Sequence, residues 1–404
     1  MTSMYTINYA LRAHKRDPFI EFIKGMLMTP FVLHAKPIPP KDDPSEKEHN
    51  GDDKSQMDEN VARYCDILSS IEELIEEHIR KQNKGVPDQS RLKRLVPSIS
   101  TFHTRLPLRE SFLLANSKHS IAARRFVPPS FNDIRRILTT AQIIAIAPKL
   151  KLITFDGDMT LYDDGEDFEQ DSKSVNLLVQ LLKYDLNVCV VTAAGYPGDA
   201  KRYEERLSGL LKGFQTAQLS KKFCERFFVL GGECNYLFQC QENYHLKYIP
   251  ESEYQPEEIL SWRDDQIKAI LDVAQENLQR CVDDMKLPCT VLRKSRAIGI
   301  VPKPGVKIFR EQLDECVLST QHRLVNYLNS PSGKQHKLPF CAFNGGRDVW
   351  VDIGNKLIGV QILQKYLGAT PEETLHVGDQ EMTLRLGANV VHYGLSTPKK
   401  LKAC

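Results

Sequence analysis

The sequence predicts an α/β fold built on a parallel sheet, and three apolar runs carry this prediction. Residues 150–155 are followed by Asp156 and Asp158, residues 186–191 by Thr192, and residues 374–377 by Gly-Asp. A helical stretch, 172–184, separates the first two runs, and this order predicts parallel strands joined by a right-handed crossover. Ligands of such sheets bind at the carboxyl ends of the strands, so the polar residues that follow these runs are candidate site residues.

Length and composition limit the class of protein. A chain of 404 residues exceeds what one core usually holds, so we expect two or three domains. The 54 basic and 52 acidic residues leave a net charge of +2. This argues against nucleic acid or a membrane as partner and favours a small molecule. No apolar run reaches the roughly 18–20 residues that cross a bilayer, and we expect a cytoplasmic protein.

Residues 1–147 predict an N-terminal helical and regulatory region. Within it, the apolar spacing over 5–34 favours a helix that ends near Pro30. The segment 36–59 is charged, rich in proline and nearly without apolar residues, which is typical of a mobile linker. An amphipathic helix is expected over 61–85. Another helix, capped by Ser130 or Asn132, is expected to hold Arg136.

The remaining residues divide into a core and an insertion. Short β-like runs alternate with helical stretches over 200–340, which we interpret as an inserted α+β cap. Residues 148–199 and 341–404 are then the catalytic core. In this scheme the core resumes with a strand at 350–353, a helix over 355–367 and the strand at 374–377.

The strongest chemical signal is FDGDMTLYDDG, residues 155–165. Asp156 and Asp158 leave the end of a predicted strand two residues apart, and like charges this close favour a cation such as Mg²⁺. With the phosphate charge screened, Asp156 suits a nucleophile that attacks phosphorus, and Asp158 suits the general acid and base. A calcium-type loop or a solvated turn is the alternative for the Asp pair alone.

Three further residues follow in the order that such chemistry requires. Thr192, in VVTAAG, offers a hydroxyl among small residues whose N–H groups can approach a phosphate. Lys356, near a helix start, can neutralise phosphate and Asp156, and Asp379, in HVGDQ, can hold Mg²⁺. Taken singly, each has a simpler explanation: a threonine that ends a strand, a surface lysine and a turn aspartate.

These motifs carry a resemblance to a known family. DGDMTL, VVTAAG, Lys356 and HVGDQ resemble the four motifs of the haloacid dehalogenase superfamily of phosphatases. Longer strings are similar to the IMP-specific 5′-nucleotidases, from about residue 5 to Gln380. They are FVPPSFNDIRRIL, FDGDMTLYDDG, VVTAAGYPGDAKRYEERL, FFVLGGECNYLF and FNGGRDVWVDIGNKLIGVQ.

The resemblance implies a Rossmann-like haloacid dehalogenase core with a cap, hydrolysis of IMP to inosine and phosphate with Mg²⁺, activation by ATP, and a homotetramer. It implies that Asp156 is the nucleophile, that Asp158 is the acid and base and also contacts substrate, and that both bind Mg²⁺ together with Asp379. It assigns the remaining IMP contacts to Asp164, Thr192, Asp348 and Lys356. An ATP effector is expected near Arg136, since arginine binds phosphate well.

The sequence departs from the family pattern after Gln380. Relatives continue with an Asn-Asp pair and another strand, whereas here Asn389 precedes Val390. We therefore expect one metal-site carboxylate and the last strand of the sheet to be absent. A frameshifted or mis-spliced gene model would explain the departure, and translation of the genomic DNA in all frames tests it. Two alternatives stay open: a catalytically weak nucleotide-binding subunit, and a phosphatase of another nucleotide or a sugar phosphate.

Overall fold

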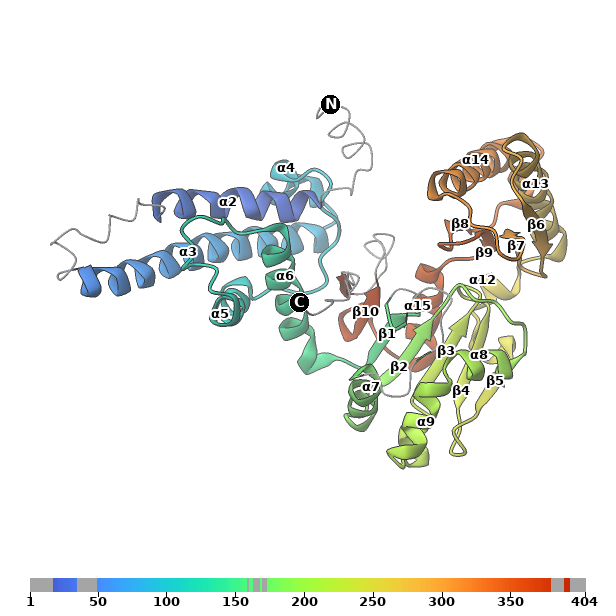
Figure 1. The fold of residues 1–404 in the computed structure, drawn as a ribbon, viewed down its shortest axis with the longest axis horizontal. Helices are drawn as coiled ribbons and strands as arrows, with labels where there is room; N and C mark the ends of the chain where they lie inside the picture. Colours follow the sequence, from blue (N-terminus) through green and yellow to red (C-terminus); the bar gives the residue numbers. More distant parts are fainter. Residues whose placement is uncertain are drawn as a thin grey trace. The chain divides into compact units, whose positions relative to one another are not determined.

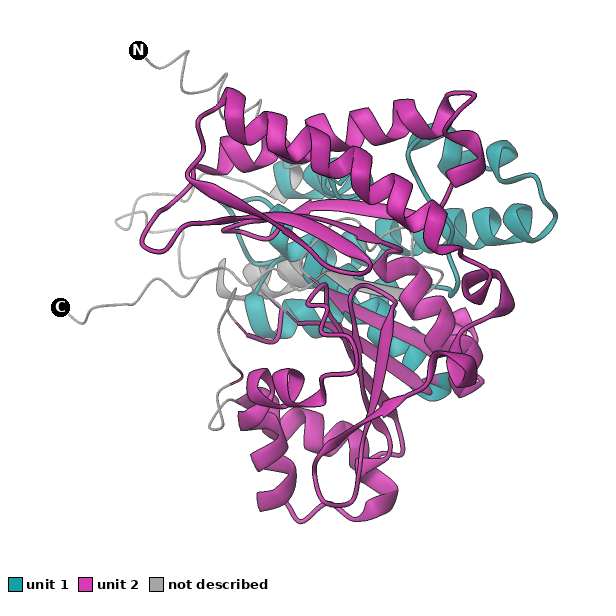
Figure 2. Ribbon diagram, turned by 90° about the vertical axis from the view of Figure 1, so that its right-hand side faces the viewer, with its two compact units in different colours: residues 1–149 teal, residues 150–404 magenta. Residues whose placement is uncertain are grey.

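The computed structural model describes residues 17–34, 49–157, 160–162, 168, 173–378 and 389–392. The chain divides into two compact units, Met1–Lys149 and Leu150–Cys404, drawn in teal and magenta in Figure 2.

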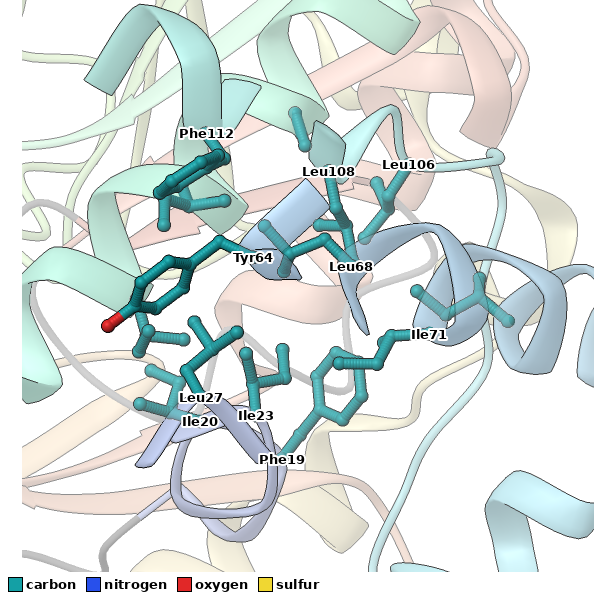
Figure 3. Close-up of a cluster of buried hydrophobic side chains, with 14 of the residues drawn as sticks. Phe19, Ile20, Ile23, Leu27, Tyr64, Leu68, Ile71, Leu106, Leu108 and Phe112 are labelled. Atoms are coloured by element: carbon teal, nitrogen blue, oxygen red, sulfur yellow. The ribbon is translucent and has the colours of Figure 1, made fainter. Parts of the chain in front are cut away.

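Unit 1 is helical. The described residues of this unit share a cluster of buried side chains that includes Leu27, Tyr64, Leu68 and Phe112, several of which face one another in Figure 3. The helices are α2 (Pro18–His34), α3 (His49–Asn83), α4 (Arg91–Leu95), α5 (Leu108–His119) and α6 (Phe131–Ile146).

Local sequence explains where α6 begins. The Ser130 side chain accepts a hydrogen bond from the Asp133 amide, and the Asp133 carboxylate accepts one from the Ser130 amide. This capping box satisfies two amides that would otherwise lack partners at the helix start. Ser130, one of the two predicted caps, therefore holds that position.

Two expectations for unit 1 were wrong in detail. The helix expected to end near Pro30 continues to His34, with Pro30 buried inside it. The predicted linker 36–59 is wrong over 49–59, where the backbone is already helical in α3. Extending a helix fixes one residue for each new hydrogen bond, so a polar stretch can prolong a stable helix that it could not nucleate. Residues 35–48 lie outside the described part.

Unit 2 is built on a seven-stranded sheet in the order β11-β10-β1-β2-β3-β4-β5 (Figure 1). Neighbours from β11 to β3 are parallel, and β4 and β5 are antiparallel additions. The strands are β1 (Leu152–Asp156), β2 (Asn187–Val191), β3 (Phe227–Gly231), β4 (Tyr236–Cys240), β5 (Leu246–Ile249), β10 (Thr374–Gly378) and β11 (Asn389–His392).

Helices cover both faces of this sheet, which explains why the residues of its central strands β1, β2 and β3 are almost all buried. Alternate residues of a strand point to opposite faces. Val188 and Val190 of β2 join one cluster with α7 and α9, whereas Cys189 and Val191 join another with α15. The helices are α7 (Lys173–Lys183), α8 (Ala200–Arg206), α9 (Ser208–Thr216), α10 (Lys221–Cys224), α11 (Glu251–Tyr254), α12 (Glu257–Leu260) and α15 (Lys356–Leu367).

A second, antiparallel sheet lies between β5 and α15 in the sequence, in the order β6-β7-β9-β8. Helices α13 and α14 share its apolar cluster, and Figure 1 shows them over one face of the sheet. The elements are α13 (Asp264–Asp284), β6 (Cys289–Arg293), β7 (Ala297–Pro302), α14 (Arg310–Asn329), β8 (Phe340–Asn344) and β9 (Val349–Ile353).

The structure draws the boundary of the insertion differently from the predicted 200–340. Strands β3, β4 and β5 belong to the seven-stranded sheet, and β9, predicted as a core strand, belongs to the second sheet. Short buried strands look alike in sequence whichever sheet they join, because pairing is decided by distant partners.

The expected absence of a last strand was also wrong, because Asn389–His392 pairs in parallel with β10. The predicted fold class is confirmed: an α/β protein with a parallel sheet, an inserted α+β region and a helical N-terminal region. Among the described residues, no helix is long and apolar enough to cross a membrane.

Candidate active site

Polar residues gather where β1, β2 and β3 end. Asp156 closes β1 and is buried, Thr192 follows β2, and Glu233 comes two residues after β3. The strands are parallel and in register, with Asp156 opposite Val191 and Val191 opposite Leu230. All three side chains therefore emerge at the same edge of the sheet, which is the expected ligand edge of this class of fold.

Lys356 reaches this edge from the start of α15. Its ammonium donates a 2.8 Å hydrogen bond to Oδ1 of Asp156. Burial disfavours the charged ammonium, but the negative charges of Asp156 and Glu233 outweigh it and raise the pKa of Lys356 above its ordinary value. The lysine is therefore a permanent cation beside the carboxylate.

A tight turn brings Lys356 to this place. Gly354 has a φ of +94°, and a Cβ there would lie 2.2 Å from the Cys234 sulfur, so only glycine fits. Asn355 then caps α15, because its side chain accepts a 2.9 Å hydrogen bond from the Ile358 amide. The Gly-Asn-Lys sequence thus turns the chain out of β9 and starts the helix with the lysine at the site.

The loop after β2 is fixed by backbone hydrogen bonds to the loop after β3. The Glu233 amide donates to the Thr192 carbonyl at 3.1 Å, and the Gly232 amide donates to the Ala194 carbonyl at 2.9 Å. Within the first loop, the Thr192 hydroxyl accepts a 3.1 Å hydrogen bond from the Ala194 amide. Thr192 is therefore held rigidly at the edge.

Tyr203 of α8 also supports this loop. Its hydroxyl donates to the Ala194 carbonyl at 2.8 Å and accepts from the Tyr196 amide at 3.0 Å. A Cβ on Gly231 would come within 1.8 Å of that hydroxyl. The glycine is needed so that the tyrosine can pass over the end of β3.

Glu233 was missed by the sequence reasoning. It is 3% exposed, and burial raises the pKa of its carboxyl, an effect that Lys356 opposes and Asp156 adds to. Its φ of +66° is unusual for a residue other than glycine. The string FFVLGGE resembles LITFDGD in being a buried strand followed by a glycine and a carboxylate, and that signal could have found it.

Thr160 and Gly157 lie just beyond Asp156. The Thr160 hydroxyl is buried and has no hydrogen-bond partner in the described part of the chain. A Cβ on Gly157 would meet the Tyr162 hydroxyl at 2.3 Å and the Thr192 Cβ at 3.6 Å. The chain after β1 therefore passes close to Thr192, with a hydroxyl available for a ligand.

Asp348 comes from the second sheet, just before β9. Its Oδ2 accepts a 2.8 Å hydrogen bond from the Trp350 indole. Its charge acts on Lys294 and Asp352, which line one small cavity together with Gly195 of the loop after β2. Burial, followed by the charge of Glu233, raises the pKa of Asp352 well above its ordinary value.

Three of the remaining predicted site residues lie outside the described residues, and the fourth lies in unit 1. Asp158, Asp164 and Asp379 lie outside the described residues, although β10 ends at Gly378 beside β1. Within the described ranges, no group of three or more His, Cys, Asp or Glu side chains is arranged to hold a metal ion. Arg136 lies on α6 of unit 1, where Nη1 is 3.7 Å from Oδ1 of Asp133.

Residues 1–396 match the family model of the IMP-specific 5′-nucleotidases. Two fungal relatives carry the name IMP-specific 5′-nucleotidase 1. The protein from Yarrowia lipolytica is 43% identical over 397 residues, which cover 96% of this chain and 91% of that protein. The protein from Neurospora crassa is 44% identical over 405 residues, which cover 96% and 92%.

Solved structures agree over nearly the whole chain. An IMP-nucleotidase of Plasmodium falciparum superimposes with a TM-score of 0.77 at 32% identity, covering 94% of this chain and 92% of that one. The same enzyme has been solved with ATP bound, with a TM-score of 0.76 at 32% identity and coverage of 94% and 82%. The chain belongs to the family of IMP-specific 5′-nucleotidases.

Proposed function

We propose that this chain is a magnesium-dependent phosphatase that hydrolyses IMP to inosine and phosphate through an aspartyl-phosphate on Asp156. One observation carries the proposal: a buried carboxylate at the ligand edge of a parallel sheet is held by a lysine that stays protonated. The substrate is supported by membership of the family and by an IMP-bound structure of the Plasmodium falciparum relative.

In the first step, a carboxylate oxygen of Asp156 attacks phosphorus, and the bond between phosphorus and the ribose 5′-oxygen breaks. The hydrogen bond from Lys356 fixes the carboxylate, and the ammonium offsets the negative charge of the approaching phosphate. The leaving 5′-oxygen takes a proton from Asp158, which yields inosine.

In the second step, Asp158 takes a proton from water as that water attacks the phosphorus. The bond between phosphorus and the Asp156 oxygen breaks, which releases phosphate and restores the carboxylate. Splitting hydrolysis in this way replaces one difficult displacement by two in-line transfers at the same position. The rigid loop around Thr192 supplies a hydroxyl and amides for the phosphate oxygens.

The described residues suit a hard divalent cation. Asp156 supplies a buried carboxylate oxygen, and the Thr160 hydroxyl has no hydrogen-bond partner in the described ranges. Mg²⁺ prefers such oxygen ligands, and we propose that Asp156, Asp158 and Asp379 hold it. When bound, the ion supplies positive charge that screens the phosphate oxygens.

The nucleoside part of the substrate is proposed to lie toward the second sheet, where Asp348 contacts it, with Asp164 as a further contact. The insertion, bounded as the structure has it, would then act as the cap. Lys294 joins the second sheet to the loop after Thr192 through its hydrogen bond to Gly195, and both parts of the site belong to unit 2.

We further propose that ATP is an activator, that Arg136 of unit 1 contacts its phosphates, and that the protein is a homotetramer. The Arg136 side chain is 54% exposed, which leaves it accessible to a ligand. If ATP increases IMP hydrolysis and Arg136→Ala abolishes the increase without changing basal activity, the assignment holds. An unchanged response to ATP would exclude Arg136. Light scattering tests the tetramer.

Phosphate release across nucleoside monophosphates and sugar phosphates tests the function, with and without Mg²⁺. We expect a strong preference for IMP, loss of activity in EDTA, and loss in Asp156→Asn. Asp265→Asn is a matched control, because Asp265 is exposed on α13 and pairs with Arg263. Equal activity of Asp156→Asn and wild type would refute the mechanism. Preference for another phosphomonoester would refute the substrate, and binding of IMP without turnover would favour a nucleotide-binding subunit.

A further inference from the structure

Lys294 joins the second sheet to the loop after β2. It lies in the turn between β6 and β7, and its ammonium donates a 3.2 Å hydrogen bond to the Gly195 carbonyl. The same Nζ atom is 4.4 Å from the centroid of the Trp350 ring and 5.5 Å from that of Tyr196. One side chain therefore contacts the loop of Thr192 and the strand that follows Asp348.

The surroundings of Lys294 disfavour its positive charge. Burial lowers the pKa of its ammonium, while the negative charges of Asp352 and Asp348 oppose that effect. Lys294, Asp352 and Gly195 line the same small cavity. Aromatic faces attract a cation, and that attraction grows as water is removed. An apolar side chain could fill this place without the cost of removing a charge from water. A lysine here therefore indicates that its hydrogen bond to the Gly195 carbonyl has a role.

Lys294 contacts the neighbours of two proposed substrate-binding residues, Thr192 and Asp348. Gly195 lies three residues after Thr192 in the loop between β2 and α8. The Trp350 indole beneath the ammonium donates a hydrogen bond to Asp348. We propose that Lys294 is a positioning residue that fixes the separation of Thr192 and Asp348, and thereby lets the site bind the phosphate and the nucleoside of one nucleotide together. This inference rests on the proposed function.

Two kinds of substrate should respond differently when Lys294 is replaced. IMP needs both ends of the site, so a shift of the second sheet weakens its binding. A small phosphomonoester such as p-nitrophenyl phosphate has no nucleoside and depends on the first-sheet residues alone. A residue with only a structural role would affect both substrates equally when replaced.

The test compares Lys294→Met, Lys294→Arg and the control Lys303→Met, an exposed lysine that follows β7. For IMP, Lys294→Met is expected to raise KM about tenfold with kcat changed less than about threefold, because misplacement of a binding group affects mainly binding. Its kcat/KM for p-nitrophenyl phosphate should fall much less than its kcat/KM for IMP. Lys294→Arg keeps the cation and should bind IMP more tightly than Lys294→Met.

An unchanged KM for IMP in Lys294→Met, equal losses on both substrates, or equal KM values for the Met and Arg variants would each overturn the proposal. Hydrogen exchange gives a readout that needs no turnover. Amides in the segment 193–196 should exchange faster in Lys294→Met than in Lys303→Met. Unchanged exchange in Lys294→Met refutes the positioning role even if the enzyme is active. Faster exchange in Lys294→Met, together with a wild type that does not hydrolyse IMP, would support the contact and reject only the proposed function.

Discussion

Lys356 and Asp156, 200 positions apart in the sequence, form a 2.8 Å hydrogen-bonded ion pair at the edge of the sheet. Asp156 is buried at the end of β1, and Lys356 begins α15 immediately after the chain leaves the second sheet. Folding of the insertion therefore places the lysine beside the proposed nucleophile. Glu233 adds a second negative charge, so the lysine is shared between two acids.

Replacement of Lys356 by Met should reduce both activity and stability. We expect kcat/KM for IMP to fall by about 10²–10³-fold, because a cation that stabilises charge at the reacting phosphate is lost. We also expect unfolding to become easier by about 3–5 kcal/mol, since Asp156 and Glu233 are left buried without their counter-ion. Phosphate-release kinetics and urea unfolding measure the two effects.

Lys365→Met is the matched control, since Lys365 is exposed on the same helix. It should leave both quantities near the wild-type values. Normal turnover in Lys356→Met would show that the ion pair has no part in the chemistry.

The sequence predicted those helices and strands that short apolar runs and caps define. The β1–α7–β2 unit and α15 lie within a residue or two of the expected bounds, because apolar runs and caps are short-range features. Thr192 and Lys356 were singled out by chemistry alone, and the structure brings both to the edge where Asp156 lies.

Tertiary contacts decide what the sequence reasoning missed. Glu233 and Lys294 matter because segments distant in sequence surround them, and no periodic pattern records that. The insertion boundary failed for the same reason: β3, β4 and β5 have apolar runs that fit either sheet.

Gly231→Ala should destabilise unit 2. The new Cβ would meet the Tyr203 hydroxyl, so either the ring moves or the end of β3 shifts, at a cost of about 1–3 kcal/mol. The hydroxyl would then lose its bonds to the Ala194 carbonyl and the Tyr196 amide, and KM for IMP should rise.

Gly25→Ala gives the contrast. Gly25 lies inside α2 with nothing within 4 Å of an added Cβ, so alanine should stabilise the helix by about 0.5–1 kcal/mol. Thermal and urea unfolding compare the two variants. Equal behaviour would mean that the predicted clash at Gly231 is absorbed without cost.

Asp133 should make the stability of unit 1 dependent on pH. Burial opposes its ionisation, but the Arg124 guanidinium, 2.7 Å from Oδ2, and Ser130 lower the pKa of Asp133 from 3.8 to about 2. A carboxyl whose pKa falls on folding stabilises the protein above its unfolded pKa. This contribution, about 2 kcal/mol, is lost as the pH falls from about 4 through about 2.

The Tm of Asp133→Asn should therefore lie below that of the wild type at pH 7, and the gap should narrow toward pH 2. Asp88→Asn, at an exposed position, should show no such gap. A gap that stays constant across this range would contradict the role given to the Arg124 pair.

The proposed aspartyl-phosphate can be detected by locating the phosphate during turnover. The full chain is mixed with IMP labelled in its phosphate and with Mg²⁺, quenched in acid within one turnover and digested, and the labelled peptide is identified by mass spectrometry. We predict an acyl phosphate on Asp156 that hydroxylamine removes, and none in Asp156→Asn. Rapid hydrolysis of IMP without label on Asp156, or with label on another residue, would contradict it.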